Sequence, residues 1–404
     1  MQNKTLAIAG VIILALCSWV AWLLAPQGDS TAAAKAAATS ANVSAALTPL
    51  GTVAAANNTG PYSPEGLLAK QAQRSALQLR YDRAEQVYSS YREATRYPHE
   101  SRPIAEHADQ TRPFAPIAEE KIPRSATTGE AIKGLRLRTT QERVFMGGQD
   151  SAWFSVQAVD ESGKPLALSI SKAWAQSVPA PGTAVAIIRA DMQFADDGAP
   201  PDAQALDGKY TARLSPSRQG FASYGGTIQV FAQFSAGGQQ SAVQFDVVYN
   251  PQVPAAWTGV REALEGGSLV FYAKALVAQA GRYVVSARVD DANGQPFALL
   301  QFNDEVAAGQ REFKLSLFGA LIRDKKPAFP LQLRDVDGFL LIPDKFPDRS
   351  NLARWAGVVH TSGRYALDKF SDAEWNSEER SRYLTEYGKD VEEARRRLEE
   401  FQIK

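Results

Sequence analysis

Disulfide bonds within this chain are excluded, because Cys17 is its only cysteine. An excess of charge is also lacking, since 44 Lys and Arg balance 44 Asp and Glu, so there is no broad positive field for nucleic acid. Histidine is scarce, and His99, His107 and His360 have no partners at metal-ligand spacing, which argues against zinc. Gly-x-Ser-x-Gly, Walker and dinucleotide motifs are absent from the sequence. Buried cores must therefore stabilise the fold, and no motif predicts a catalytic site.

Long apolar runs are absent too, with one exception from Leu6 to Ala25. As a helix this run is about 30 Å long, enough to cross a bilayer core. Its bulky end, Trp19 to Leu24, does not suit a signal peptidase, and Leu16 before Cys17 does not suit lipid attachment. The sequence favours a retained membrane anchor, with a cleaved signal and a lipoprotein as the alternatives.

Charges beside the run indicate its orientation. Lys4 precedes it and Asp29 is the first charge after it, which places the N-terminus in the cytoplasm. A disulfide-free exported chain is typical of bacteria. We therefore expect a single-pass protein of the bacterial inner membrane, with its bulk in the periplasm or at the cell surface.

Helical segments are expected on both sides of a β-rich region. After residues 1–26 and a flexible Ala/Ser/Thr linker (27–62), a stalk helix is predicted over 63–97, followed by a Pro-rich linker or extended segment (98–133). An amphipathic helix is predicted over 371–404. Its apolar stripe could form a homodimeric coiled coil, pack on its own domain, or pair with the stalk helix. The stalk stripe is Leu77, Tyr81, Ala84, Tyr88 and Tyr91, and the C-terminal stripe is Leu384, Tyr387, Val391, Ala394, Leu398 and Phe401.

Between the helices, short alternating strands predict a mainly β fold with two tandem immunoglobulin-like β-sandwiches, at 134–251 and 252–370. A repeated turn supports duplication: Asp160 to Leu168 aligns with Asp291 to Leu299, with Asp, Gly, Pro, Ala and Leu identical. In each copy the glycine supplies a positive φ and the proline begins the next strand.

Several of these segments resemble bacterial exported tandem Ig-like domain proteins of the choice-of-anchor X type. The most specific part is the acidic segment Asp196-Asp197-Gly198, Asp202 and Asp207-Gly208-Lys209-Tyr210-Thr211. Residues 281–288 and 293–296 resemble the family's repeat strand and turn. The resemblance implies tandem Ig-like domains and an exported location, and it implies little chemistry, because the family's roles are poorly defined.

The acidic segment is also the candidate metal site. Asp196, Asp197, Asp202 and Asp207 could supply hard oxygen ligands to a structural calcium ion. The spacing is not that of an EF-hand, and the alternative is a plain acidic turn, since Asp and Gly are common turn formers. Asp290, Asp291 and Asn293 form a weaker version.

Function is predicted only by class. The favoured interpretation is a non-catalytic, membrane-anchored interaction module that binds a protein or glycan partner. One alternative is an envelope polysaccharide hydrolase or its accessory subunit, whose Asp/Glu pair would meet only in three dimensions. Another is a structural or sensory scaffold that forms a homodimer through 384–401. Exposed aromatics could stack on a partner, and the candidates are Trp153, Trp174, Trp257, Trp355 and Trp375.

Overall fold

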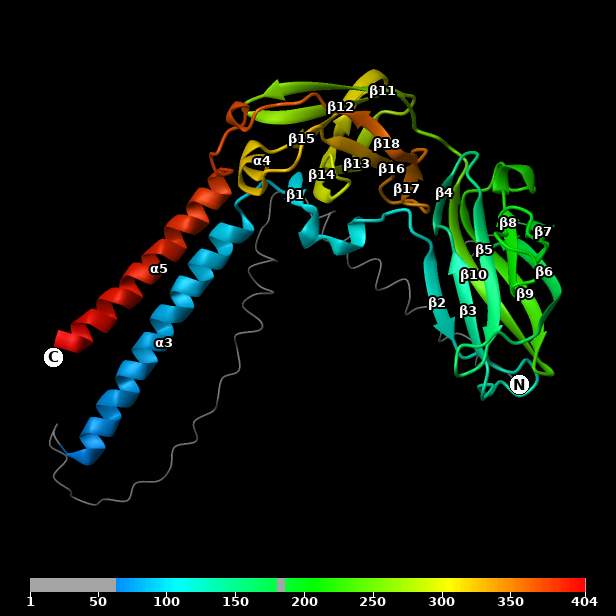
Figure 1. The fold of residues 1–404 in the computed structure, drawn as a ribbon, viewed down its shortest axis with the longest axis horizontal. Coiled ribbons are helices and arrows are strands. Elements are labelled where there is room, and N and C mark those ends of the chain that lie inside the picture. Colours follow the sequence, from blue (N-terminus) through cyan, green and yellow to red (C-terminus); the bar gives the residue numbers. More distant parts are fainter. Residues whose placement is uncertain (1–62, 180–185, 404) are drawn as a thin grey trace. The chain divides into compact units, whose positions relative to one another are not determined.

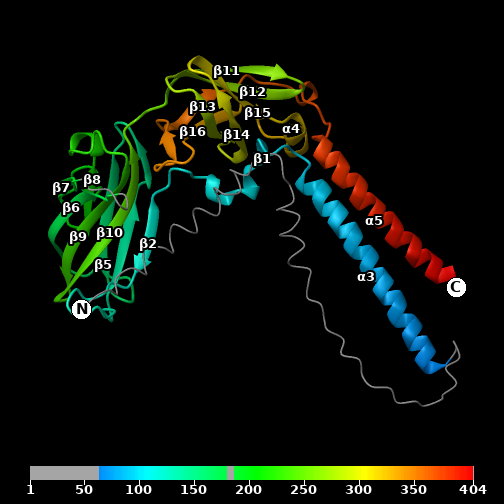
Figure 2. The same cartoon turned by 180° about the vertical axis from the view of Figure 1, so that it is seen from behind.

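The computed structural model describes residues 63–179 and 186–403, which form a mainly β fold with two long helices (Figures 1 and 2). The predicted anchor Leu6–Ala25 and the linker 27–62 lie outside the described residues. Within the described part, no helix is both long enough and apolar enough to cross a membrane.

The first β domain, formed by β2 to β10, consists of two sheets around one core. One sheet has the order β2-β3-β5-β8 and the other β4-β10-β9-β6-β7. Burial alternates along β9, as a strand with one solvated face requires. Phe154 and Phe245 meet between the sheets with ring centroids 5.0 Å apart. The strands are β2 (Ile117–Lys121), β3 (Arg136–Gln141), β4 (Phe145–Gly147), β5 (Ala152–Val159), β6 (Leu168–Ser177), β7 (Arg189–Asp191), β8 (Lys209–Leu214), β9 (Gly226–Ala236) and β10 (Gln239–Asn250), with the 3-10 turn η3 (Pro216–Arg218).

The second β domain also encloses its core between two sheets. A six-stranded sheet has the order β1-β14-β13-β16-β17, with β18 beside β16, and a three-stranded sheet has the order β11-β12-β15. Tyr283 and Phe313 are fully buried between them, with ring centroids 5.5 Å apart. The elements are β1 (Ser101–Pro103), β11 (Ala255–Glu265), β12 (Ser268–Val277), β13 (Gly281–Asp290), β14 (Pro296–Val306), β15 (Gly309–Leu317), α4 (Gly319–Lys325), β16 (Gln332–Leu341), β17 (Arg349–Asn351), β18 (Trp355–Thr361) and η4 (Leu367–Lys369).

Of the two interpretations of the Pro-rich segment 98–133, a linker or an extended segment over the first β domain, the structure agrees with the second in part, because the segment contributes a strand to each β domain. Its β1 pairs with β14 of the second β domain, and its β2 pairs with β3 of the first. Two 3-10 turns, η1 (Ile104–Glu106) and η2 (Ala108–Gln110), lie between these strands. Because β1 precedes the first β domain and β11 follows it, the first β domain is inserted into the second. The sequence did not locate either strand, because both are short and β1 pairs with residues about 200 positions farther along the chain.

The repeated turn has the same geometry in both copies. Asp160 Oδ1 accepts the Ser162 and Lys164 amides at 2.8 and 2.9 Å. Asp291 Oδ1 accepts the equivalent amides of Asn293 and Gln295 at the same distances. The flanking strands differ: β13 and β14 form the predicted hairpin, whereas β5 and β6 belong to different sheets. The turn chemistry is thus repeated, but the strand pairing around it is not.

The two long helices are α3 (Pro64–Ala94) and α5 (Glu378–Ile403). From Gln73 onward, α3 lies beside α5 and runs antiparallel to it (Figures 1 and 2). Near one end Tyr91 contacts Tyr387 with ring centroids 5.3 Å apart, and farther along Arg395 reaches Tyr81. All residues of both predicted stripes are buried or half-buried. Of the three arrangements considered for the C-terminal stripe, pairing with the stalk helix is the one observed.

Helix α5 begins later than its sequence suggests. Ser371, the first residue of the predicted helix, accepts the Ala373 amide at 3.2 Å without starting a helix. The helix begins after Ser377, whose Oγ accepts the Arg380 amide at 3.1 Å. The intervening segment contacts the second β domain, where the Ser371 amide donates to the Gly267 carbonyl at 2.9 Å.

Candidate functional site

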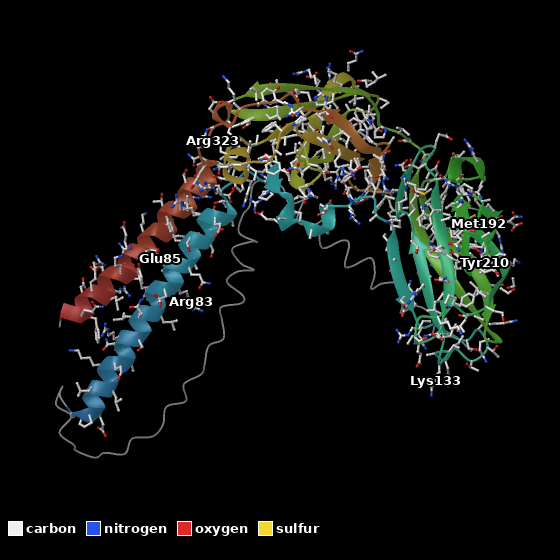
Figure 3. All side chains as sticks on the ribbon, in the orientation of Figure 1. Arg83, Glu85, Lys133, Met192, Tyr210 and Arg323 are labelled. Atoms are coloured by element: carbon white, nitrogen blue, oxygen red, sulfur yellow. The ribbon has the colours of Figure 1, made fainter. Side chains whose placement is uncertain are left out.

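The acidic loop lies between β7 and β8 of the first β domain, where Met192 and Tyr210 mark its flanks in Figure 3. The structure brings three of the four predicted ligands together. One carboxylate oxygen each from Asp196, Asp202 and Asp207 lies within 4.8 Å of the other two. Asp197 does not join them, because its exposed side chain bonds the Ala199 amide at 2.9 Å.

Backbone amides hold this cluster in place. Asp202 is buried and accepts the Gly198 amide at 2.7 Å. Asp196 accepts the amides of Asp207 and Gly208 at 3.2 and 2.9 Å. Gly198 and Gly208 have φ of +72° and +79°, a region that disfavours residues with a Cβ. Glycine therefore lets the backbone turn its amides toward the carboxylates.

This geometry could hold a hard cation. Among the described residues, no Lys or Arg forms an ion pair with any of the three clustered carboxylates. Three converging carboxylates repel one another, and a calcium ion would offset that repulsion with its preferred oxygen ligands. The amide hydrogen bonds also offset part of the repulsion among the carboxylates. The alternative is therefore a plain acidic turn that holds no ion.

Replacing Asp202 by Ala is expected to lower the free energy of unfolding of the first β domain by about 1–3 kcal/mol, even in chelator, because the Gly198 amide loses its acceptor and the buried Asp202 side chain is truncated. Chemical denaturation followed by amide exchange in β8 and β9 measures this effect. Asp197→Ala is the matched control, since that side chain is exposed. Equal losses in the two variants would contradict a specific role of Asp202.

A second cluster, which the sequence did not predict, lies in the second β domain. Glu262 of β11 contacts His360 Nε2 of β18 at 3.1 Å and accepts the Tyr365 hydroxyl at 2.8 Å. The Gly363 amide also donates to Glu262, at 2.7 Å. Burial, and then Glu262, raise the pKa of Tyr365 to about 12, so its hydroxyl stays protonated. The cluster joins the two sheets and supplies no activated nucleophile.

The third cluster, here called the helix-base cluster, joins α3 and α5 to the second β domain. Glu374 accepts hydrogen bonds from Arg92, Arg96 and Arg380 at 3.1, 3.0 and 2.6 Å. Arg96 also forms a two-bond pair with Asp324 of α4, at 2.7 and 3.0 Å. The hydrogen bond from Arg380 lowers the pKa of Glu374, and the bond from Arg96 lowers the pKa of Asp324.

These lowered pKa values predict an acid-sensitive junction. Each carboxylate contributes its stabilisation fully above the unfolded pKa of about 4, and the contribution is lost as the pH falls through the lower folded pKa. We expect Glu374→Gln to melt at least about 2–4 °C below wild type at pH 7, with the difference shrinking below about pH 4. Thermal melts across pH measure it. A pH-independent difference would exclude this linkage.

Three of the five tryptophans considered for partner stacking pack against other side chains of the chain. Trp174 stacks on Phe231 with ring centroids 5.0 Å apart, and the Arg189 guanidinium lies 4.4 Å from the Trp174 ring centre. Trp257 stacks on Trp355 at 6.0 Å. Ring faces occupied by neighbours are not free to stack on a sugar.

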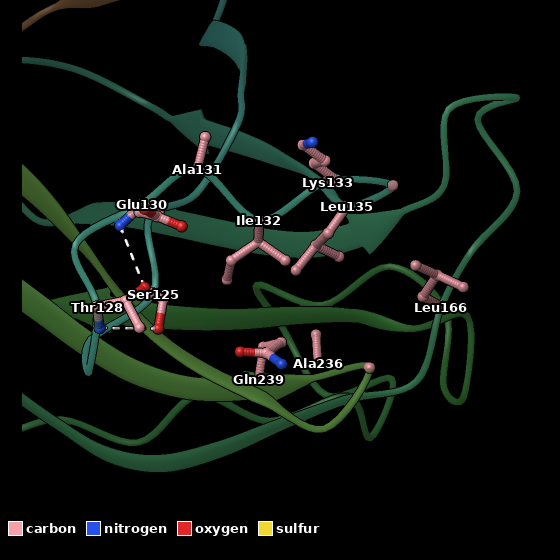
Figure 4. A pocket seen from close by; sticks show the side chains of 12 residues that line it. Ser125, Thr128, Glu130, Ala131, Ile132, Lys133, Leu135, Leu166, Ala236 and Gln239 are labelled. Atoms are coloured by element: carbon pink, nitrogen blue, oxygen red, sulfur yellow. Dashed lines mark hydrogen bonds between the residues drawn. The ribbon is translucent and has the colours of Figure 1, made fainter.

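A pocket of about 410 Å³ opens at one end of the first β domain (Figure 4). Its walls come from the loop between β2 and β3, from Leu166 and from the turn between β9 and β10. The pocket was not predicted, because half of it belongs to a segment interpreted as a linker. Its lining residues are Ser125, Thr128, Glu130–Leu135, Leu166, Ala236, Gly237 and Gln239.

Comparisons with known proteins do not assign the chain to a family. No family model and no curated protein matches it. Among solved structures it is similar to a DUF4785 family protein from Legionella pneumophila, with a TM-score of 0.38 and 12% identity over 56% of this chain and 57% of that one. It is also similar to dimeric latent PorU from Porphyromonas gingivalis, with a TM-score of 0.17 and 8% identity over 58% and 33%. The chain thus spans less than two thirds of either protein, and similarity at this level carries no argument.

Proposed function

We propose that this chain is a non-catalytic interaction protein of the bacterial envelope, anchored in the inner membrane by Leu6–Ala25 and binding a protein or glycan partner through its first β domain. The topology is the observation that carries this proposal. The first β domain is an insertion, whereas both long helices join the second β domain. In this proposal the second β domain and the helix pair form a support, and the inserted domain meets the partner.

The proposal includes immunoglobulin-like character for both β domains. Two sheets around one core in each domain support it, as do the repeated turn and the resemblance to the choice-of-anchor X type. We assign the acidic loop a structural role, with calcium as its ion. In thermal melts, calcium should raise the melting temperature of the wild type relative to chelator, and Asp207→Asn should reduce that rise. If the wild-type melting curves with calcium and with chelator coincide, the loop is a hydrogen-bonded turn without an ion.

The two alternatives receive less support. A polysaccharide hydrolase needs two carboxylates in one groove, and the pocket at the end of the first β domain contains only Glu130. A homodimer through 384–401 would need the stripe that packs against α3, because the opposite face of α5 is charged and forms ion pairs within the helix, such as Lys389 with Glu386.

Site-specific photo-crosslinking of the full-length protein in its native envelope tests the proposal. A crosslinking residue at Gln244, exposed on β10, should give discrete adducts with a partner. The matched position Glu386, exposed on α5, should give none. Adducts from Glu386 alone would favour the scaffold alternative, and the absence of adducts from the first β domain would overturn the proposed function.

A further inference from the structure

The pocket at the end of the first β domain has preformed walls. The loop between β2 and β3 closes on itself, where the Ser125 amide donates to the Glu130 carbonyl at 2.8 Å. The same loop is tied to β10, because the Ala126 amide donates to the Gln240 carbonyl at 2.8 Å and Ser241 Oγ donates to the Arg124 carbonyl at 2.7 Å. A ligand would therefore meet an ordered site and would not have to order the loop.

The pocket combines an apolar floor with three long and exposed polar side chains, those of Glu130, Lys133 and Gln239. Leu135 and Ala236 are buried parts of the domain core, and Ile132 and Leu166 pack against it from the pocket side. Figure 4 shows Ile132 on one side, Gln239 on the opposite side, and Leu166 and Glu130 at the two ends. Within the described residues, the carboxylate of Glu130 forms neither a hydrogen bond nor an ion pair. The Gln239 amide has no side-chain hydrogen bond in that part either.

We propose that this pocket binds the amino terminus of a peptide whose first side chain is apolar. The ammonium group is complementary to the Glu130 carboxylate, and a charge-assisted hydrogen bond between them would fix its position. The first side chain would cover Ile132, Leu135 and Leu166, and Gln239 can donate to and accept from the adjoining peptide group. About 410 Å³ is enough for two residues. This inference rests on the proposed function, since it identifies the chemistry of the partner.

Calorimetric titration of the full-length protein with leucyl-alanine tests the inference. A ligand of this size should bind with a dissociation constant of about 1 mM. N-acetylation of the ligand removes its charge and should weaken binding about tenfold or more. Glu130→Gln should weaken binding of the free-amine ligand by a similar factor. The variant should then bind the free and the acetylated ligand equally, because both changes remove the same ion pair. Glu161→Gln, an exposed carboxylate on a nearby turn, should bind like wild type.

Three results would overturn the pocket inference: no binding of leucyl-alanine, equal binding of its acetylated form, or equal binding of glycyl-alanine, which lacks the apolar side chain. Leu166→Trp, which fills the pocket from its rim, should also abolish binding. The proposed function is tested separately, by the crosslinked adducts formed from position 244. If these adducts persist in Glu130→Gln, the pocket inference fails and the proposed function stands. If the wild-type sequence with the crosslinker at position 244 gives no adducts, the proposed function fails, whether or not leucyl-alanine binds.

Discussion

Replacing Arg288 by Gln is expected to lower the free energy of unfolding of the second β domain by about 3 kcal/mol. The Arg288 side chain is 4% exposed and donates to four acceptors. Two belong to Gln110, its carbonyl at 3.1 Å and its side chain at 2.6 Å. The others are the Asp335 carbonyl at 3.0 Å and Asp337 Oδ1 at 2.7 Å. Glutamine cannot reach all four, and buried acceptors without donors are costly.

Amide exchange resolves this effect by domain, because a chain with several domains does not unfold in one step. In Arg288→Gln, exchange should rise in β13 and β16, and limited proteolysis should accelerate in η1 and η2, which Arg288 holds through Gln110. Arg282→Gln is the matched control: it lies on the same strand, is only partly buried and bonds Asn303 at 2.8 Å. Equal behaviour of the two variants would contradict the assigned role of Arg288.

A single added methyl group at Gly319 should be at least as disruptive, at about 3 kcal/mol or more. A Cβ there would overlap the Gly267 carbonyl oxygen and approach the Ser371 amide nitrogen at 2.9 Å. These atoms are backbone and bond each other at 2.9 Å, so neither can move aside without breaking that bond.

Thermal melting and exchange in α4 would measure the effect of Gly319→Ala. Gly225→Ala is the control, because its added Cβ would meet only Pro347 and Pro251 at 3.8 and 3.9 Å, an ordinary contact. A fully folded Gly319→Ala variant with the stability of wild type would show that the three segments meeting at Gly319 are less tightly packed than the structure indicates.

The candidate metal loop was predicted in part. The sequence identified four clustered aspartates, and three of them converge. Asp197 could not be separated from the others by spacing, because the direction of its side chain depends on the turn at Ala199. The Glu262 cluster left no linear signal, since Glu262 and His360 lie on strands of different sheets.

The sequence alone determined the features that depend on local residue patterns. These are the apolar run at Leu6–Ala25, the apolar stripes of the two helices, the mainly β secondary structure and the repeated Asp-Gly turn. Tertiary structure alone decided the partners. It pairs α5 with α3, places β1 and β2 in different domains and gathers the helix-base cluster around Glu374. The physical reason is that periodicity shows which face of an element is apolar, whereas what covers that face depends on shape and on residues far away in sequence.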